Sequence, residues 1–234
     1  ARRRRAYVQS LELANVVLVP LAAFMIIIAP EAVRLVLGEK WKDLVRPLQI
    51  MLLQVPLRAS VRMGDITGTA VGRVYAIGVL KIIYAGMIGL AAFSGVRWGL
   101  SGVTIAVTLA VFVNLVLMVR FTMSYVRISL ADYGQTWIPG LSLGTLVTGV
   151  ALPCAWILRQ KVGSEILTLS AVVILTVLSV ALTVWFRPRA IGRTAFQVIM
   201  DFGRRIPRLS ALLSGLEKRG SDVPPSAPRP GREA

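Results

Sequence analysis

Apolar runs about 20 residues long, the length that a helix needs to cross a bilayer, recur along most of this 234-residue chain. Backbone groups in lipid must be hydrogen-bonded within the segment itself, and such even apolar runs favour helices over barrel strands. The sequence therefore predicts an all-α integral membrane protein, a six-helix transmembrane bundle. The expected spans are residues 13–29, 44–71, 74–94, 99–119, 138–158 and 166–186.

The composition agrees with a membrane protein and excludes several classes of function. Hydrophobic residues make up 56% of the chain and the mean hydropathy is +0.71, which excludes a soluble fold. There is no histidine, so imidazole chemistry is unavailable, and we expect no catalytic residue, metal or cofactor. The single Cys154 is expected to be a small buried hydrophobe. Because the chain starts at Ala1 without an initiator methionine, we expect a fragment of a longer protein.

A polar stripe runs along the second predicted span. An ionised side chain at bilayer depth costs roughly 2.5 to 3.5 kcal/mol even on lenient insertion scales. The stripe should therefore face protein or water, and we expect it to mark the path of a polar substrate. Spacing of three or four residues places all of its members on one helix face. They are Gln54, Arg58, Arg62, Asp65 and Thr69.

The charges of the stripe can be paired by their position in a helical hairpin. If residues 72–73 form a tight turn, Asp65 and Lys81, each eight residues from Arg73, lie at the same height on antiparallel helices. We predict an intramembrane ion pair between them, serving structure or ion coupling. Arg58 and Arg62 then lack an acidic partner, and the planar guanidinium donor fork suits phosphate. The predicted substrate contacts are Arg58, Arg62, Gln54 and Lys81.

Simpler interpretations of the same residues stay open. The helix could leave the membrane near Ser60, which would place Arg58 and Arg62 at the cytoplasmic surface and let Lys81 snorkel to it. Glutamines within spans often serve as hydrogen bonds between helices, as we expect for Gln49 and Gln54. Small residues permit close helix packing, as we expect for Gly86, Gly89, Gly140 and Gly144.

Basic residues suggest an orientation. Lys and Arg concentrate in the N-terminal segment, in the connection after the fourth span and in the C-terminal tail, so both termini should be cytoplasmic. We divide the chain into a bundle over residues 1–190, a basic amphipathic cytoplasmic helix over 191–219 and a disordered tail over 220–234. Anionic membrane lipid is the expected partner of the tail, and nucleic acid is not expected. A capping box at Ser129 and Asp132 predicts a short surface helix. Tryptophans fall at predicted helix ends, namely Trp41, Trp98, Trp137, Trp156 and Trp185.

Four short motifs carry a family resemblance over about residues 7–119: 29–31 (Ala-Pro-Glu), 37–41 (Leu-Gly-Glu-Lys-Trp), 47–50 (Pro-Leu-Gln-Ile) and 70–73 (Ala-Val-Gly-Arg). The chain resembles the polysaccharide transporter branch of the multidrug/oligosaccharidyl-lipid/polysaccharide exporter superfamily, the Wzx-type flippases. The resemblance implies the C-terminal lobe of a two-lobe, alternating-access transporter in the bacterial inner membrane.

The same resemblance implies a substrate and a site. Its cargo would be an undecaprenyl-pyrophosphate-linked oligosaccharide, a unit of lipopolysaccharide or exopolysaccharide, moved to the periplasmic leaflet. A cationic cavity holds the pyrophosphate in such flippases, and Arg58 and Arg62 are the matching residues here, with Lys81 as a third cation or as the partner of Asp65. Polysaccharide polymerase and assembly proteins would be partners.

Three other functions remain as alternatives. A multidrug or cation antiporter of the same superfamily would need acidic residues in its cavity, where this chain offers cations. A membrane-embedded polysaccharide polymerase or ligase would need a general base or a metal site. Any six-helix fragment could also be a non-transporting scaffold that anchors a polysaccharide assembly complex.

Overall fold

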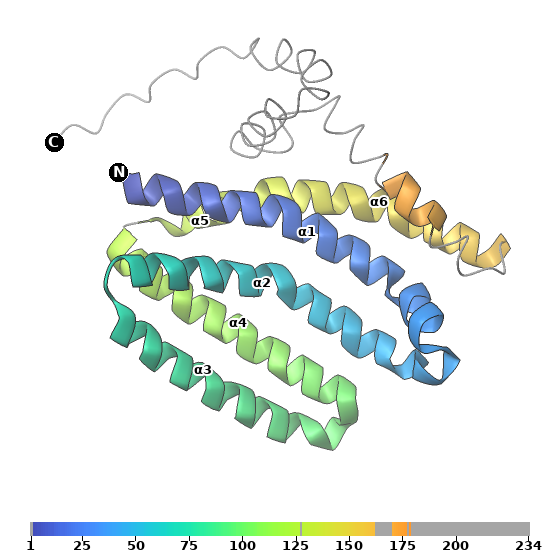
Figure 1. The fold of residues 1–234 in the computed structure, drawn as a ribbon, viewed down its shortest axis with the longest axis horizontal. Coiled ribbons are helices and arrows are strands. Elements are labelled where there is room, and N and C mark those ends of the chain that lie inside the picture. The colour runs from blue at the N-terminus through green and yellow to red at the C-terminus, as the bar shows by residue number, and fades with distance from the viewer. Residues whose placement is uncertain (1, 127, 162–169, 177, 179–234) are drawn as a thin grey trace, which may run out of the picture.

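The computed structural model describes residues 2–126, 128–161, 170–176 and 178 (Figure 1). Within those ranges the chain forms helices joined by short turns and no strand. The elements are α1 (Arg2–Leu37), the 3-10 helix η1 (Glu39–Leu44), α2 (Val45–Ala70), α3 (Val74–Gly95), the 3-10 helix η2 (Val96–Trp98), α4 (Gly99–Val126), α5 (Leu130–Gln135) and α6 (Ile138–Lys161).

The predicted spans correspond to helices wherever the structure describes them. The bounds of α2, α3 and α6 differ from the predictions by three residues or fewer. The capping box is confirmed: Ser129 accepts from the Ala131 amide at 3.3 Å, and Asp132 accepts from the Ser129 amide at 3.1 Å. Of the predicted span 166–186, residues 170–176 and 178 are described, and they are helical. Its remainder and the segments 191–219 and 220–234 lie outside the described residues.

The first helix is longer than the apolar run that predicted it. α1 continues from Arg2 to Leu37 and includes both Pro20 and Pro30. Proline removes one helical hydrogen bond, and packing must compensate for that loss if the helix continues. Val33, beyond Pro30, is only 3% exposed, so the helix is packed just past this proline, whereas its last residues, 34–37, are exposed.

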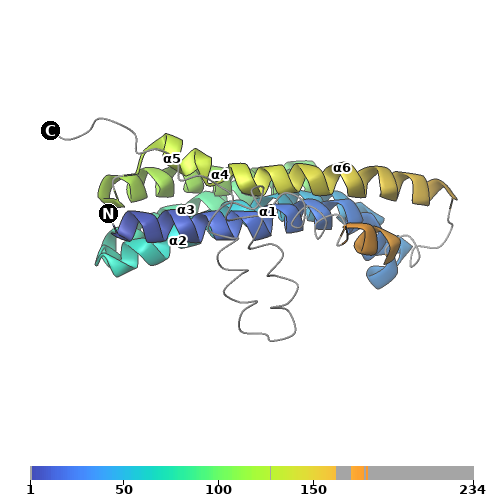
Figure 2. The ribbon, with the colours of Figure 1, turned by 90° about the horizontal axis from the view of Figure 1, so that it is seen from above.

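The long helices lie side by side, and each contacts a small number of neighbours (Figures 1 and 2). α1 packs against α6 on one side and α2 on the other, α2 packs against α4, and α4 packs against α3. α3 makes little contact with α2, although a turn of three residues joins them. The turn depends on Gly72, whose φ of 82° is one that other residues rarely adopt.

Apolar stretches of membrane-spanning length identify a helical membrane protein. Among the described residues, three stretches are long and apolar enough: Arg4–Leu37, Val74–Val126 and Leu130–Leu158. The second contains both helices of the α3–α4 hairpin. α2 does not meet the same criterion, because the polar stripe lowers its hydropathy. It gains its place through packing between α1 and α4.

The glycine and tryptophan expectations are confirmed in part. A Cβ on Gly140 would lie 2.5 Å from the Asn15 backbone oxygen, and one on Gly144 would lie 3.1 Å from Val19 Cγ1, so both permit the α1–α6 approach. The prediction for Gly86 and Gly89 is wrong, since a Cβ there would meet nothing within 4 Å. These two glycines lie on the outward side of α3.

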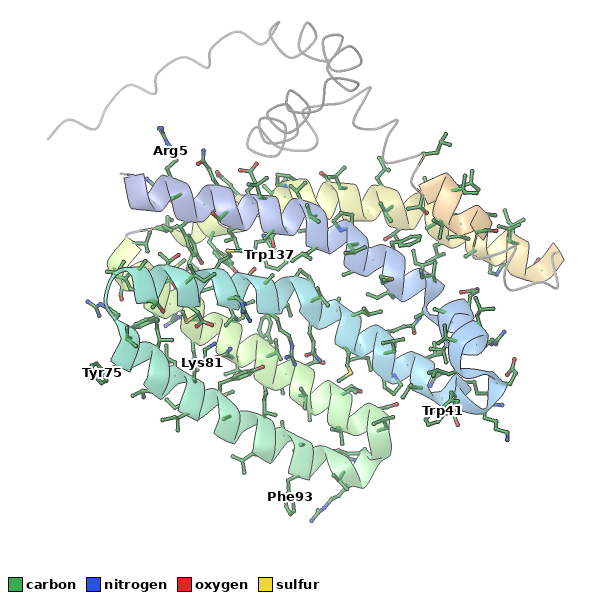
Figure 3. All side chains as sticks on the ribbon, viewed as in Figure 1. Arg5, Trp41, Tyr75, Lys81, Phe93 and Trp137 are labelled. Carbon is green, nitrogen blue, oxygen red and sulfur yellow. The ribbon has the colours of Figure 1, made fainter. Side chains whose placement is uncertain are left out.

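Four of the five tryptophans lie in the described residues. Trp41, Trp98 and Trp156 are 54%, 74% and 60% exposed, in agreement with a place at the membrane interface. Trp137 is different, because its indole nitrogen is buried (Figure 3). It lies in the two-residue turn between α5 and α6. Trp185 lies outside the described residues.

Candidate functional site: a cationic groove between α2 and α3

Apart from the buried Gln54, the polar stripe lies on a face of α2 that the neighbouring helices leave open. On one side Gln49 Nε2 donates to the Ile26 carbonyl of α1 at 2.8 Å, which confirms its predicted role between helices. On another side Val61 packs with Leu115 and Met118 of α4. Arg58 and Arg62 are exposed on the remaining face. Helical periodicity therefore predicted the common face correctly.

A groove of about 630 Å³ opens along this face, between the C-terminal half of α2 and α3. Three of its residues are charged, and two of the three are cations, so the groove carries a net positive charge. Arg62, Asp65, Ile66, Thr69 and Ala70 of α2 line it together with Lys81 of α3. Of the predicted substrate contacts, the structure brings Arg62 and Lys81 into the groove. Arg58 lies one turn away on the same helix face.

The predicted ion pair forms at the wall of this groove. Lys81 Nζ contacts Asp65 Oδ2, with side-chain exposures of 47% for the lysine and 21% for the aspartate (Figure 3). The second carboxylate oxygen, Oδ1, is buried and accepts no hydrogen bond from the described residues. Thr69 turns its hydroxyl back to the Asp65 backbone carbonyl at 2.9 Å. The pair holds the lysine at the groove and leaves Arg62 without an anionic partner among the described residues.

Gln54 lies behind Arg58 instead of beside the groove. Its side chain is only 1% exposed, and its Nε2 donates to Thr108 Oγ1 of α4 at 2.6 Å. Its Oε1 accepts from Arg58 Nε at 3.1 Å and from Arg58 Nη2 at 2.9 Å. The Thr108 hydroxyl in turn donates to the Thr104 carbonyl at 2.7 Å. This chain of hydrogen bonds from α4 fixes one edge of the guanidinium and leaves Nη1 unused.

Two glycines that the sequence analysis did not single out hold α2 close to its neighbours. A Cβ on Gly64 would lie 3.0 Å from Met118 and Thr122 atoms of α4, and one on Gly68 would lie 2.7 Å from Ile77 Cδ1. The Tyr125 hydroxyl donates to the Gly64 carbonyl at 3.3 Å. The signal was present, because small residues at positions i and i+4 are typical of close helix contacts in membranes. This contact sets the rotation of α2 and hence the direction of the stripe.

A second ion pair that the sequence analysis missed joins the two sides of the same end of the bundle. Arg4 Nη2 lies 2.5 Å from Asp132 Oδ2, so the start of α1 is tied to α5. Asp132 is outside the predicted spans, and the Ser129 amide and the Arg4 guanidinium lower the pKa of its carboxyl. No sequence pattern connects these two residues, because 128 positions separate them.

The fold and its apolar stretches define a helical membrane protein. Residues 1–46 match the model of a family described as polysaccharide biosynthesis protein, which supports involvement of the chain in that process. The matched segment covers α1, η1 and the first residues of α2, and it ends before the residues of the groove. No curated protein and no solved structure matches the chain.

Proposed function

We propose that the chain is part of a flippase that moves undecaprenyl-pyrophosphate-linked oligosaccharides across the bacterial inner membrane. The observation that carries this proposal is the cationic groove on the open face of α2, where Arg62 and Lys81 line one hollow and Arg58 lies one turn away. The family match supports the biosynthetic context. The groove adds a cationic surface, which a carrier of anionic lipid needs and which other proteins of polysaccharide biosynthesis do not require.

The electrostatics of the groove favour a diphosphate. A sugar headgroup with a pyrophosphate cannot cross hydrocarbon, so a carrier must offer it a hydrated path with compensating charge. Arg62 presents guanidinium donors that no described carboxylate occupies, whereas the charge of Lys81 is balanced by Asp65. Two arginines one helical turn apart can contact neighbouring phosphates. The transfer requires no covalent step, so the proposed protein is a transporter and not an enzyme.

Within this proposal, Gln54 is a positioning residue for Arg58. Its amide is buried and uses both ends in contacts with Thr108 and Arg58. A buried acceptor that takes two donors from one guanidinium limits the rotamers of the arginine. Arg58 would thus meet a phosphate with less loss of side-chain entropy than a free surface arginine.

The proposed orientation puts both termini of this chain in the cytoplasm. The C-terminal end of α2, the N-terminal end of α1 and α5 lie at the same end of the bundle (Figure 1). Arg4, Arg5 and Arg73 lie at that end and would face the cytoplasmic leaflet. The groove then opens near the leaflet in which the lipid-linked substrate is made, and alternating access with an upstream lobe would deliver it to the periplasmic side.

Transport of lipid-linked oligosaccharide into inverted membrane vesicles tests the proposal. The full-length protein would carry Arg58→Gln or Arg62→Gln, with Arg46→Gln as the control, since Arg46 is also an exposed arginine of α2 but lies at the end of the helix opposite to the groove. Loss of one charged hydrogen bond is worth about 1.5 to 3 kcal/mol, or about ten- to a hundred-fold in rate or affinity. We expect that loss for Arg58→Gln and for Arg62→Gln, and normal transport for the control.

Two outcomes would contradict the proposal. Unimpaired transport by the double variant Arg58→Gln/Arg62→Gln, at normal expression and insertion, would remove the cationic site from the mechanism. Uptake of drugs or cations that depends on Asp65 instead of the arginines would favour an antiporter of the same superfamily.

A further inference from the structure

A second hollow lies on the other side of α2, between its C-terminal half and the start of α1. Its volume is about 280 Å³. Its floor includes Tyr7 and Met63, which belong to an apolar cluster with Leu11 and Val126. The residues that line it include Ala6, Tyr7 and Ser10 of α1 and Met63, Ile66 and Ala70 of α2. No charged side chain lines this hollow, in contrast to the groove beside α3.

The apolar hollow and the cationic groove share a wall. Ile66 and Ala70 line both of them, so the two lie side by side across α2 at the same height along the helix. Ile66 is 57% exposed and forms a low ridge, and Ala70 leaves room beside it. Residues four positions apart on a helix are about 5 to 6 Å apart, so Arg62 is close to Ile66. A single ligand can therefore contact a cation and enter the apolar hollow.

This arrangement fits a phosphate joined directly to a hydrocarbon chain. In a polyprenyl diphosphate the chain begins at the phosphate oxygen, whereas glycerol and ester groups separate the phosphate of a phospholipid from its acyl chains. The two wall residues, Ile66 and Ala70, have apolar side chains. The hydroxyls of the neighbouring Thr67 and Thr69 already donate to backbone carbonyls at 2.8 and 2.9 Å, so the wall offers no free donor to such a polar linker. The occupant that the site fits is thus the isoprenoid chain of the substrate and not a bulk phospholipid.

We propose that the first isoprenoid units of the lipid-linked substrate cross α2 over Ile66 and Ala70 and lie between α1 and α2. The placement rests on the proposed function for its phosphate, which would remain at Arg62. It means that the carrier recognises the chemical junction between phosphate and hydrocarbon, in addition to the charge. Specificity for a polyprenyl carrier would then come from α1 and α2 together.

Two soluble probes separate the contributions of charge and chain. Farnesyl diphosphate and inorganic pyrophosphate would be bound to the full-length protein in detergent micelles, and their dissociation constants compared. We expect farnesyl diphosphate to bind at least about ten-fold more tightly, the effect of removing about two methylene groups from water. Ala6→Phe and Ser10→Leu, both at exposed positions of α1, fill the hollow and should abolish the preference without weakening pyrophosphate.

Controls distinguish failure of this inference from failure of the proposed function. Val17→Phe enlarges an exposed residue of α1 outside the hollow and should keep the preference. Arg62→Gln should weaken both probes. Equal binding of the two probes by the unchanged protein would overturn the proposed isoprenoid site and leave the phosphate site intact. Binding of neither probe would overturn both sites. If phosphatidylglycerol displaced farnesyl diphosphate equally well from the unchanged protein and from the Ala6→Phe variant, the proposed isoprenoid site would also be overturned.

Discussion

Replacement of Gly140 by alanine tests a close contact between α1 and α6. A Cβ at that position would lie 2.5 Å from the Asn15 backbone oxygen and 2.8 Å from the Asn15 carbonyl carbon. Ordinary carbon–oxygen contacts between helices are about 3.3 to 3.6 Å, so α1 and α6 would have to separate by roughly 0.8 Å. The atoms in the way belong to the backbone and cannot turn aside. Gly149, on the same helix, would place its Cβ in open space.

The expected magnitude follows from two opposing terms. Overpacking of a close contact costs about 1 to 3 kcal/mol, whereas alanine is favoured over glycine within a helix by about 0.8 to 1 kcal/mol. Gly149→Ala should therefore raise the free energy of unfolding, and Gly140→Ala should lower it. Because both variants gain the alanine term, we expect them to differ by the overpacking cost alone, about 1 to 3 kcal/mol. Titration with sodium dodecyl sulfate in mixed micelles, followed by circular dichroism, measures this difference.

Equal stability of the two alanine variants would refute the reasoning. It would mean that the α1–α6 crossing at Asn15 and Gly140 is not made in the protein. The tie between Arg4 and Asp132 would then have to hold α1 and α5 together without that crossing.

Three further predictions concern the groove and its surroundings. Gln54→Leu should reduce transport about ten-fold because Arg58 loses the acceptor of a charge-assisted hydrogen bond. Gln49→Leu removes only a contact to α1 and should leave transport unchanged. Equal losses in the two variants would contradict a positioning role for Gln54. Asp65→Asn combined with Lys81→Gln should destabilise less than the sum of the two single changes, and additive losses in the unfolding titration would argue against the ion pair. Asp132 has a pKa below its ordinary value of 3.8, so its stabilising effect should be present above that pH and lost as the pH falls through the lower pKa of the folded state. The difference in unfolding free energy between the unchanged protein and Asp132→Asn should therefore shrink below about pH 4. A difference that stays constant with pH would exclude this effect.

Much of the helical arrangement was predictable because hydropathy and turn position act locally. The ion pair between Asp65 and Lys81 could be placed from sequence because each residue is eight positions from Arg73, in the turn between the two helices. The common face of Arg58 and Arg62 followed from helical periodicity. These features need only the geometry of one helix or one hairpin.

Features that depend on how helices rotate against each other could not be predicted. Gly64 and Gly68 make close contacts and Gly86 and Gly89 do not, although both pairs are small residues within predicted spans. The burial of Gln54 and of the Trp137 indole nitrogen depends on the same rotation. Sequence gives the face of a helix that is polar, but the neighbour that covers each of the other faces comes from tertiary packing.

The polarity of α2 has a consequence for how the protein is made. A segment that carries Arg58, Arg62 and Asp65 is a poor substrate for insertion on its own, whereas the α3–α4 hairpin that follows is strongly apolar. We expect α2 to wait at the translocon until α3 emerges, so that Lys81 can neutralise Asp65 and the two enter the lipid as a pair. A ribosome stalled before Lys81 should therefore leave α2 accessible to aqueous reagents, and one stalled after α4 should not.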